Sequence, residues 1–209
     1  MALFHRATIV PSKEQLIAEW APRQTWGPSA DAALHVIGSY RFDDPEARVG
    51  MEAFLVSAGD DLLHVPLTYR DAPLDSAEDS LIATMEHSVL GTRWVYDGLH
   101  DPTFTTMLAA TTMTGQGEAL GMAVYEGRWY VAPSNVRISG GGWTLERVPV
   151  DGFVIDSEDD GCVSLGNDRF ELLVHRRPVA RPRPPIALTA TWAEQPDPVV
   201  LAEVRRRQR

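Results

Sequence analysis

The densest group of side chains capable of chemistry lies in one short stretch of the chain. It combines carboxylates, imidazoles, a guanidinium and a phenol, which suit general acid–base catalysis or a His/Asp metal site. A structural interpretation competes with this one, because Asp101 would cap a helix and Arg93 would pair with Glu86 or Asp97. The spacing matches no catalytic template, so we expect no catalytic residue and treat the group as a candidate ligand-binding site. Its residues are Glu86, His87, Arg93, Tyr96, Asp97 and His100.

The other reactive residues predict neither a cofactor nor a metal ion. The six histidines form no H-x-x-x-H or H-E-x-x-H pattern, which would place two ligands on one helix face. Cys162 is the only cysteine, so an intrachain disulfide and a cysteine-rich zinc site are excluded. Acidic neighbours should raise the pKa of its thiol. The run Gly140–Trp143 lacks the lysine and the following helix of a P-loop, and therefore predicts a turn.

Composition indicates a globular protein with a net charge of −10 over 209 residues. A charge of this sign repels phosphate backbones, so we expect no nucleic-acid partner. No apolar stretch is long enough to cross a membrane, and residues 1–11 do not have the pattern of a signal peptide. The cytoplasm is the expected location. Core packing is the expected use of the six tryptophans, with stacking on sugar rings as the alternative.

The first section predicts a mixture of helices and strands. Ser12 and Gln15 form a capping box that begins a helix over Lys13–Trp20. Strands are expected over 33–42, over 51–57 and through an alternating face of Leu63, Val65, Leu67 and Tyr69. Pro66 removes one ladder donor, which predicts a bulge or an edge strand. Helical spacing predicts a helix from Leu81 to Val89, then an extended segment over 93–96 and a helix from Asp101-Pro102 to about Gly115.

The second section predicts antiparallel β structure. Short apolar runs with frequent turn signals extend from Glu118 to Ala193, and Gly166-Asn167 marks a hairpin. The segment 181–185 predicts a stiff linker before a late strand over 186–192. Asp197-Pro198 predicts the start of a final helix that ends in the arginine run. The expected fold class is α+β, in two sections without an internal repeat.

Three motifs in the first section resemble the N-terminal cap of bacterial maltokinases and related sugar kinases. They are the segment Glu19–Trp26, with its W-x-P-x-Q-x-W pattern, the strand Val65–Arg70, and the segment Val95–Pro102, similar to the family's Y-D-A-x-x-D-P. The resemblance spans roughly residues 10–114. It implies an α/β cap, made of a small antiparallel sheet with helices, in a domain over residues 1–114.

A shorter resemblance links Val163–Arg177 to the N-lobe hairpin of the same kinases. In that family the segment ends in F-x-L-K-L-F-R-R, and its lysine holds the ATP phosphates. Leu173 occupies the matching position here, so the cation is missing. The chain also has no H-x-D-x-x-x-x-N loop, and too few residues follow Arg177 for a catalytic lobe. The resemblance implies a degenerate N-lobe over residues 115–209, closed by a C-terminal helix.

Two functional hypotheses follow. The resemblance implies a non-catalytic protein that binds or regulates a protein partner in trehalose, maltose and α-glucan (glycogen) metabolism. The alternative is a small-molecule or sugar-binding protein or an enzyme, with a site between the two sections near Glu86, Arg93, Asp97 and His100. Kinase activity is not expected under either hypothesis, because phosphoryl transfer depends on electrostatic stabilisation that a leucine cannot supply.

Overall fold

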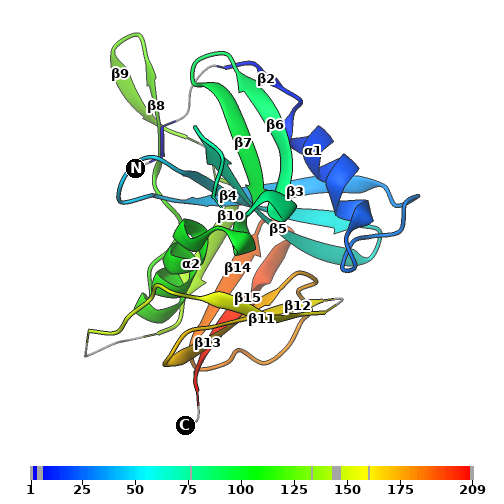
Figure 1. Ribbon diagram of the computed structural model, residues 1–209, viewed down its shortest axis with the longest axis vertical. Coiled ribbons are helices and arrows are strands. Elements are labelled where there is room, and N and C mark those ends of the chain that lie inside the picture. Colours follow the sequence, from blue (N-terminus) through cyan, green and yellow to red (C-terminus); the bar gives the residue numbers. More distant parts are fainter. Residues whose placement is uncertain are drawn as a thin grey trace.

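The protein is built mainly from antiparallel β-sheets, with two α-helices packed against them (Figure 1). A computed structural model describes residues 2–3, 7–75, 77–132, 134–142, 147–159 and 161–207. Two six-stranded sheets contain most of the strands, and a three-stranded sheet projects from one end. The α+β expectation therefore holds in its coarse form, with β structure in the majority.

The first sheet contains the strands of the first section. Its order is β2-β6-β7-β5-β4-β3, and every neighbouring pair is antiparallel. Helix α1 (Lys13–Trp20) begins at the predicted Ser12–Gln15 capping box and continues into the 3-10 turn η1 (Ala21–Arg23). The strands are β2 (Ile9–Val10), β3 (Leu34–Phe42), β4 (Gly50–Ala58), β5 (Asp61–Arg70), β6 (Leu81–His87) and β7 (Gly91–Asp97).

The helix predicted over Leu81–Val89 is wrong, because this segment forms strand β6 after the short turn η2 (Glu78–Ser80). Its partner β7 offers a full antiparallel ladder, from the pair Leu81↔Tyr96 to the pair His87↔Gly91. A register irregularity between Leu81 and Ala83 shifts the side chains along the strand. Pairing across the sheet therefore overrides a periodicity that, in isolation, resembles a helix.

Pro66 lies in a central strand with a regular register, so the predicted bulge or edge strand is wrong. Strand β5 has β4 on one side, where Pro66 pairs with Ala53. On the other side the ladder with β7 begins only at Leu67, opposite Asp97. The missing N–H of Pro66 therefore falls just beyond the end of that ladder and leaves no partner unsatisfied.

The second sheet follows helix α2 (Pro102–Thr114), which begins at the N-cap Asp101 and ends at Gly115 in the left-handed conformation, as predicted. The sheet order is β10-β14-β15-β13-β12-β11, again with antiparallel neighbours. The strands are β10 (Val136–Gly140), β11 (Val154–Glu158), β12 (Cys162–Gly166), β13 (Phe170–His175), β14 (Ala187–Trp192) and β15 (Gln195–Arg206). Residues 143–146, within the predicted β section, lie outside the described residues.

The predicted C-terminal helix is also wrong, because β15 runs from Gln195 to Arg206 in the middle of the second sheet. Its residues 199–202 are buried between β13 and β14. Pro198 lies between Gln195 and Val199, where the register with β14 is irregular. A proline at such an irregularity does not have to break a ladder bond. The Asp-Pro pair is therefore compatible with a strand and does not begin a helix here.

The two large sheets share one strand order, although the sequence shows no internal repeat. In the first sheet a meander of β3, β4 and β5 is followed by the hairpin β6–β7, whose second strand pairs with β5. In the second sheet the meander of β11, β12 and β13 is followed by β14–β15, whose second strand pairs with β13. A short strand, β2 or β10, completes each sheet next to β6 or β14.

Two hydrophobic cores stabilise this arrangement. One lies between α1 and the first sheet and contains Leu16, Ile17, Trp26, Val65 and Tyr69. The larger core combines residues of both sections, since Tyr40, Phe42, Phe104, Leu172 and Leu201 belong to one cluster. In the part of the chain that the structure describes, no helix is long and apolar enough to cross a membrane.

Candidate functional site

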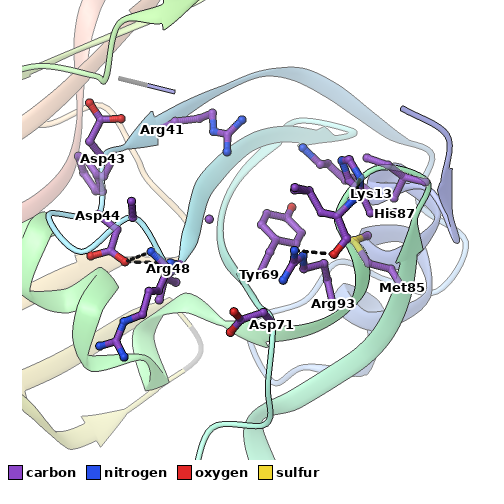
Figure 2. A pocket seen from close by; sticks show the side chains of 16 residues that line it. Lys13, Arg41, Asp43, Asp44, Arg48, Tyr69, Asp71, Met85, His87 and Arg93 are labelled. Carbon is purple, nitrogen blue, oxygen red and sulfur yellow. Dashed lines mark hydrogen bonds between the residues drawn. The ribbon is translucent and has the colours of Figure 1, made fainter. Parts of the chain in front are cut away.

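A cleft of about 510 Å³ opens beside the α1 core, between the β3–β4 connection and the β6–β7 hairpin (Figure 2). This volume is in the range of small-molecule sites. Most of its polar lining is charged or aromatic. The lining residues are Ile9, Lys13, Arg41, Phe42, Asp43, Asp44, Ala47, Arg48, Val49, Gly50, Tyr69, Asp71, Met85, His87, Leu90 and Arg93.

Four elements supply the side chains around the centre of the cleft. Lys13 begins α1, Arg41 lies near the end of β3, Tyr69 lies near the end of β5, and Arg93 lies on β7. The register places Tyr69 opposite Val95, two residues from Arg93, so both side chains project from the same face of the sheet. Figure 2 shows Arg41 pointing across the cleft toward the side where Tyr69, Lys13 and Arg93 lie.

Lys13 is the only lysine in the chain, and its surroundings hold it in place. Its ammonium donates to Glu52, a carboxylate that is only 5% exposed. The other oxygen of Glu52 accepts from Ser39 at 2.8 Å. The Lys13 nitrogen also lies 5.2 Å from the ring centroid of Tyr69, within range of a cation–π interaction.

Tyr69 has a buried hydroxyl that makes no hydrogen bond in the structure. Burial raises the pKa of this phenol well above its ordinary value, and the negative charge of Glu52 adds to the effect. The hydroxyl therefore stays protonated and can donate a hydrogen bond. A buried donor without an acceptor costs about 1–3 kcal/mol, which makes this group a notable feature of the cleft.

Two acidic residues at the edge of the cleft, Asp43 and Asp44, are turned away from its centre. Asp44 accepts hydrogen bonds from the backbone N–H groups of Glu46, Arg48 and Val49, at 2.8–2.9 Å. Partial burial opposes ionisation, but these three donors lower the pKa of Asp44 below its ordinary value. In Figure 2 the carboxylates of Asp43 and Asp44 both point away from Tyr69.

The structure divides the six predicted site residues between the two ends of the β6–β7 hairpin. Glu86, His87 and Arg93 lie near its turn, and two of them, His87 and Arg93, line the cleft. Glu86 accepts from Thr92 at 2.7 Å, the Nδ1 of His87 accepts from two backbone N–H groups of the turn, and Arg93 donates to the Leu90 carbonyl.

The other three predicted residues lie at the far end of β7, outside the cleft lining. The Tyr96 hydroxyl accepts from the Leu74 N–H at 2.9 Å. Asp97 caps the 3-10 turn η3 (Gly98–His100), and its carboxylate lies 4.0 Å from the Nε2 atom of His100. The six residues therefore do not form one pocket.

Asp97 instead belongs to a buried network that joins the two sheets. Its carboxylate accepts from Arg176, a residue that is 0% exposed and lies just beyond β13. The guanidinium of Arg176 lies 4.8 Å from the ring centroid of Trp26. Nearby, His64 on β5 accepts from the Tyr40 hydroxyl at 2.8 Å and contacts the His175 carbonyl at 3.3 Å. Burial, together with the charge of Arg176, lowers the pKa of His64 to about 3.

The hairpin that resembles a kinase N-lobe is formed by β12 and β13, and its predicted turn is present. Leu173 lies between the buried residues Leu172 and Val174, on the opposite face of the strand. It pairs with Ser164 on one side and Glu203 on the other. No cation occupies its position in the ladder.

Glu203 beside Leu173 is already neutralised by arginines. It is 2% exposed and accepts from Arg181 at 2.7 Å and from Arg205 at 3.0 Å. On the same sheet, burial and then the charge of Asp159 raise the pKa of Cys162, as the sequence predicted for an inert thiol. Among the described residues, no group of three or more His, Cys, Asp or Glu side chains is arranged to hold a metal ion.

A second surface feature is the hairpin of β8 (Gly121–Tyr125) and β9 (Arg128–Val131), which pairs with β1 (Ala2–Leu3) and projects from the body of the protein (Figure 1). Six of the large apolar side chains that are exposed in the described residues lie in or next to this hairpin. They are Leu120, Val124, Tyr125, Trp129, Tyr130 and Val131. Exposed apolar patches of this kind mark interaction surfaces.

Sequence reasoning singled out Arg93 but missed Lys13, Arg41 and Tyr69 at the centre of the cleft. Lys13 entered only as the first residue of a helix, and Tyr69 only as part of an apolar strand face. One signal was present, because Lys13 is the single lysine among many arginines. Nothing in the local sequence marks Arg41 or Tyr69, because only the pairing of β3 with β4 and of β4 with β5 brings them together.

Comparison with known proteins relates the first section to a family. Residues 20–101, from the end of α1 to the N-cap of α2, match the family model described as the maltokinase N-terminal cap domain. This range includes strands β3 to β7 and agrees with the motifs at Trp20, Val65 and Val95. No curated protein matches the chain.

Proposed function

Because residues 20–101 match the maltokinase N-terminal cap domain, we propose that the chain is a non-catalytic binding protein in maltose, trehalose and α-glucan (glycogen) metabolism. The observation that carries this proposal is the family match itself. The matched segment supplies strands β3 to β7 of the first sheet, which packs against α1 on one side.

The arrangement around Leu173 supports a role without phosphoryl transfer. Such a reaction requires fixed positive charge against the phosphates. At the position that resembles the phosphate-binding lysine, the chain has a hydrocarbon side chain next to the carboxylate of Glu203. The nearby guanidinium groups of Arg181 and Arg205 are bound to that carboxylate. The one lysine, Lys13, is bound to Glu52 on the other sheet.

The β8–β9 hairpin is the surface that we assign to the protein partner. Trp129 and Tyr130 are 59% and 46% exposed, and aromatic residues of these types dominate the binding energy of protein interfaces. The hairpin lies outside the segment that matches the cap family. The hairpin therefore offers the partner an attachment point that is separate from the segment over residues 20–101.

Affinity capture from a native lysate tests this function. Tagged protein should recover an enzyme that acts on maltose, trehalose or an α-glucan. The double variant Trp129→Ser/Tyr130→Ser should lose that enzyme. The control Val154→Ser/Val179→Ser removes apolar side chains of 68% and 63% exposure elsewhere and should retain it. Recovery of no such enzyme by the unmodified protein would contradict the proposal.

A second candidate function is the binding of a small molecule or sugar, and the cleft at Lys13, Tyr69 and Arg93 is the observation that favours it. Thermal unfolding with maltose, trehalose, glucosamine, nucleotides and divalent metal ions distinguishes this candidate. A ligand present at about 100 times its Kd stabilises the folded protein by about 2.7 kcal/mol. Unchanged midpoints with every compound would exclude these ligands from the cleft.

A further inference from the structure

Positively charged side chains and a buried phenol face the centre of the cleft. The positive groups are the side chains of Lys13, Arg41 and Arg93, which come from α1, β3 and β7. The charge of Arg41 acts on Tyr69 directly, where it opposes the effect of Glu52 on the pKa of the phenol. Figure 2 shows Lys13, Tyr69 and Arg93 together on one side of the cleft, with Arg41 pointing toward them from across it.

The hydrogen-bonding capacity of Lys13 and Arg93 exceeds the bonds that the described residues supply to them. An ammonium has three N–H donors, and the bond from Lys13 to Glu52 uses one of them. A guanidinium has five, and the bond from Arg93 to the Leu90 carbonyl uses one. The Tyr69 hydroxyl is a donor with no acceptor, although it is buried. Such a group indicates that an acceptor arrives with a ligand.

The carboxylates around the cleft do not oppose an anionic ligand. Asp44 is committed to three backbone N–H groups of its own loop, and Asp43 points away from Tyr69. Glu52 lies behind Lys13, where Lys13 and Ser39 occupy its two oxygens. Figure 2 shows Asp71 at the edge of the cleft below Arg93, where it can accept a hydrogen bond from a hydroxyl group of a bound molecule.

We infer that this cleft binds a small phosphomonoester, with its phosphate between Lys13, Arg41 and Arg93 and one phosphate oxygen accepting from the Tyr69 hydroxyl. A carboxylate is planar and is satisfied by the fork of a single arginine. Donors that approach from three elements, with a fourth below them, instead suit a tetrahedral group with several oxygens and close to two negative charges. The remaining volume accommodates the organic part of the ligand.

This inference goes beyond the proposed function and does not depend on a protein partner. The capture experiment above tests the β8–β9 hairpin, which contributes no residue to the cleft. Loss of phosphate binding and loss of partner capture are therefore separate results.

Isothermal titration calorimetry on the full chain tests the site, with inorganic phosphate, glycerol 3-phosphate and acetate as probes. We expect phosphate and glycerol 3-phosphate to bind and acetate to bind at least tenfold more weakly. Tyr69→Phe keeps the ring and removes the hydroxyl, and should weaken phosphate binding about fivefold, the loss that corresponds to one hydrogen bond. Arg41→Gln and Arg93→Gln should each weaken it at least tenfold.

Arg128→Gln is the matched control, because it removes the same charge from the exposed β8–β9 hairpin and should leave the Kd for phosphate unchanged. Circular dichroism of each variant checks that it remains folded. The inference is overturned if phosphate does not bind, if acetate binds as tightly as phosphate, or if Arg128→Gln weakens binding as much as Arg41→Gln does.

Discussion

Arg176, just beyond β13 of the second sheet, is bound to Asp97, at the end of β7 of the first sheet, and both side chains are buried. This ion pair joins parts of the chain that are 79 positions apart in sequence. The Trp26 ring lies against the guanidinium and excludes water from it. The relative placement of the two sheets therefore depends on a charge pair that neither sheet could bury alone.

Removing one partner of this pair should destabilise the protein strongly. Asp97→Ala removes the hydrogen-bonded partner of the buried Arg176 guanidinium and leaves only the carboxylate of Glu158, 3.9 Å away, near its charge. Breaking a buried pair in this way costs about 3–5 kcal/mol. The free energy of unfolding in urea measures the effect. Glu46→Ala is the control, because its pair with Arg48 is exposed and its removal should cost less than about 1 kcal/mol. Equal costs for the two variants would contradict the role assigned to the buried pair.

The stability of the protein should fall as the pH is lowered below 6.5, partly because of His64. Its pKa is about 3 in the folded state, against an ordinary value of 6.5, so in this interval only the unfolded chain binds the proton. Each such histidine then contributes a loss of up to about 1.4 kcal/mol for every pH unit between these two values. The contribution is absent above pH 6.5, where neither state is protonated.

His64→Gln tests this pH dependence. The substituted glutamine side chain can still accept a hydrogen bond from Tyr40 but does not titrate, so the slope of unfolding free energy against pH should decrease between pH 6 and 4.5. His175, whose pKa burial and Arg181 lower to about 4, is present in both proteins and keeps its own contribution. Identical slopes for the two proteins would show that His64 does not titrate as its burial requires.

Gly140 on β10 should not tolerate a side chain. A Cβ atom at this position would lie 1.9 Å from the backbone oxygen of Thr111 in α2, so Gly140→Ala must displace the helix from the sheet. We expect a loss of about 1–3 kcal/mol in unfolding free energy, as for other overpacked sites. In Gly161→Ala the nearest atom would be 3.8 Å away, and the change should be within about 0.5 kcal/mol. A similar loss in both variants would argue against close packing of α2 on β10.

In the double variant Arg41→Gln/Arg93→Gln, which removes two cations of the cleft, addition of ATP and magnesium should leave the thermal unfolding midpoint unchanged. The position that resembles the kinase lysine is Leu173, and the adjacent arginines are bound to Glu203. A nucleotide bound at about 100 times its Kd would stabilise the protein by about 2.7 kcal/mol, which a thermal scan detects readily. A nucleotide ordered against the hairpin over 163–177 in a crystal would overturn the non-catalytic interpretation.

Local signals predicted those elements whose ends are determined by nearby residues. The capping box at Ser12 and the Asp101-Pro102 pair each begin a helix, and alternation over Leu63–Tyr69 identified a strand with one face in the α1 core. Sequence reasoning failed where pairing with a distant strand decides the outcome. The segment 81–87 has apolar residues at helical spacing, but β7 pairs along most of its length.

The candidate site was predicted only in part, for a similar reason. The predicted residues are close together in sequence. Strand β7 has seven residues, however, and its two ends are about 20 Å apart. Residues near the β6–β7 turn therefore reach the cleft, and residues near Asp97 reach the buried network instead. The remaining cleft residues come from α1, β3 and β5, and no local pattern connects these segments.

The common strand order of the two large sheets means that each connection in one half has an architectural counterpart in the other. The β4–β5 turn corresponds to the β12–β13 turn, and the β6–β7 hairpin to the β14–β15 hairpin. The β6–β7 hairpin borders the cleft, whereas the β14–β15 hairpin does not. Insertions placed at equivalent turns would therefore separate effects on ligand recognition from effects on folding within a single molecule.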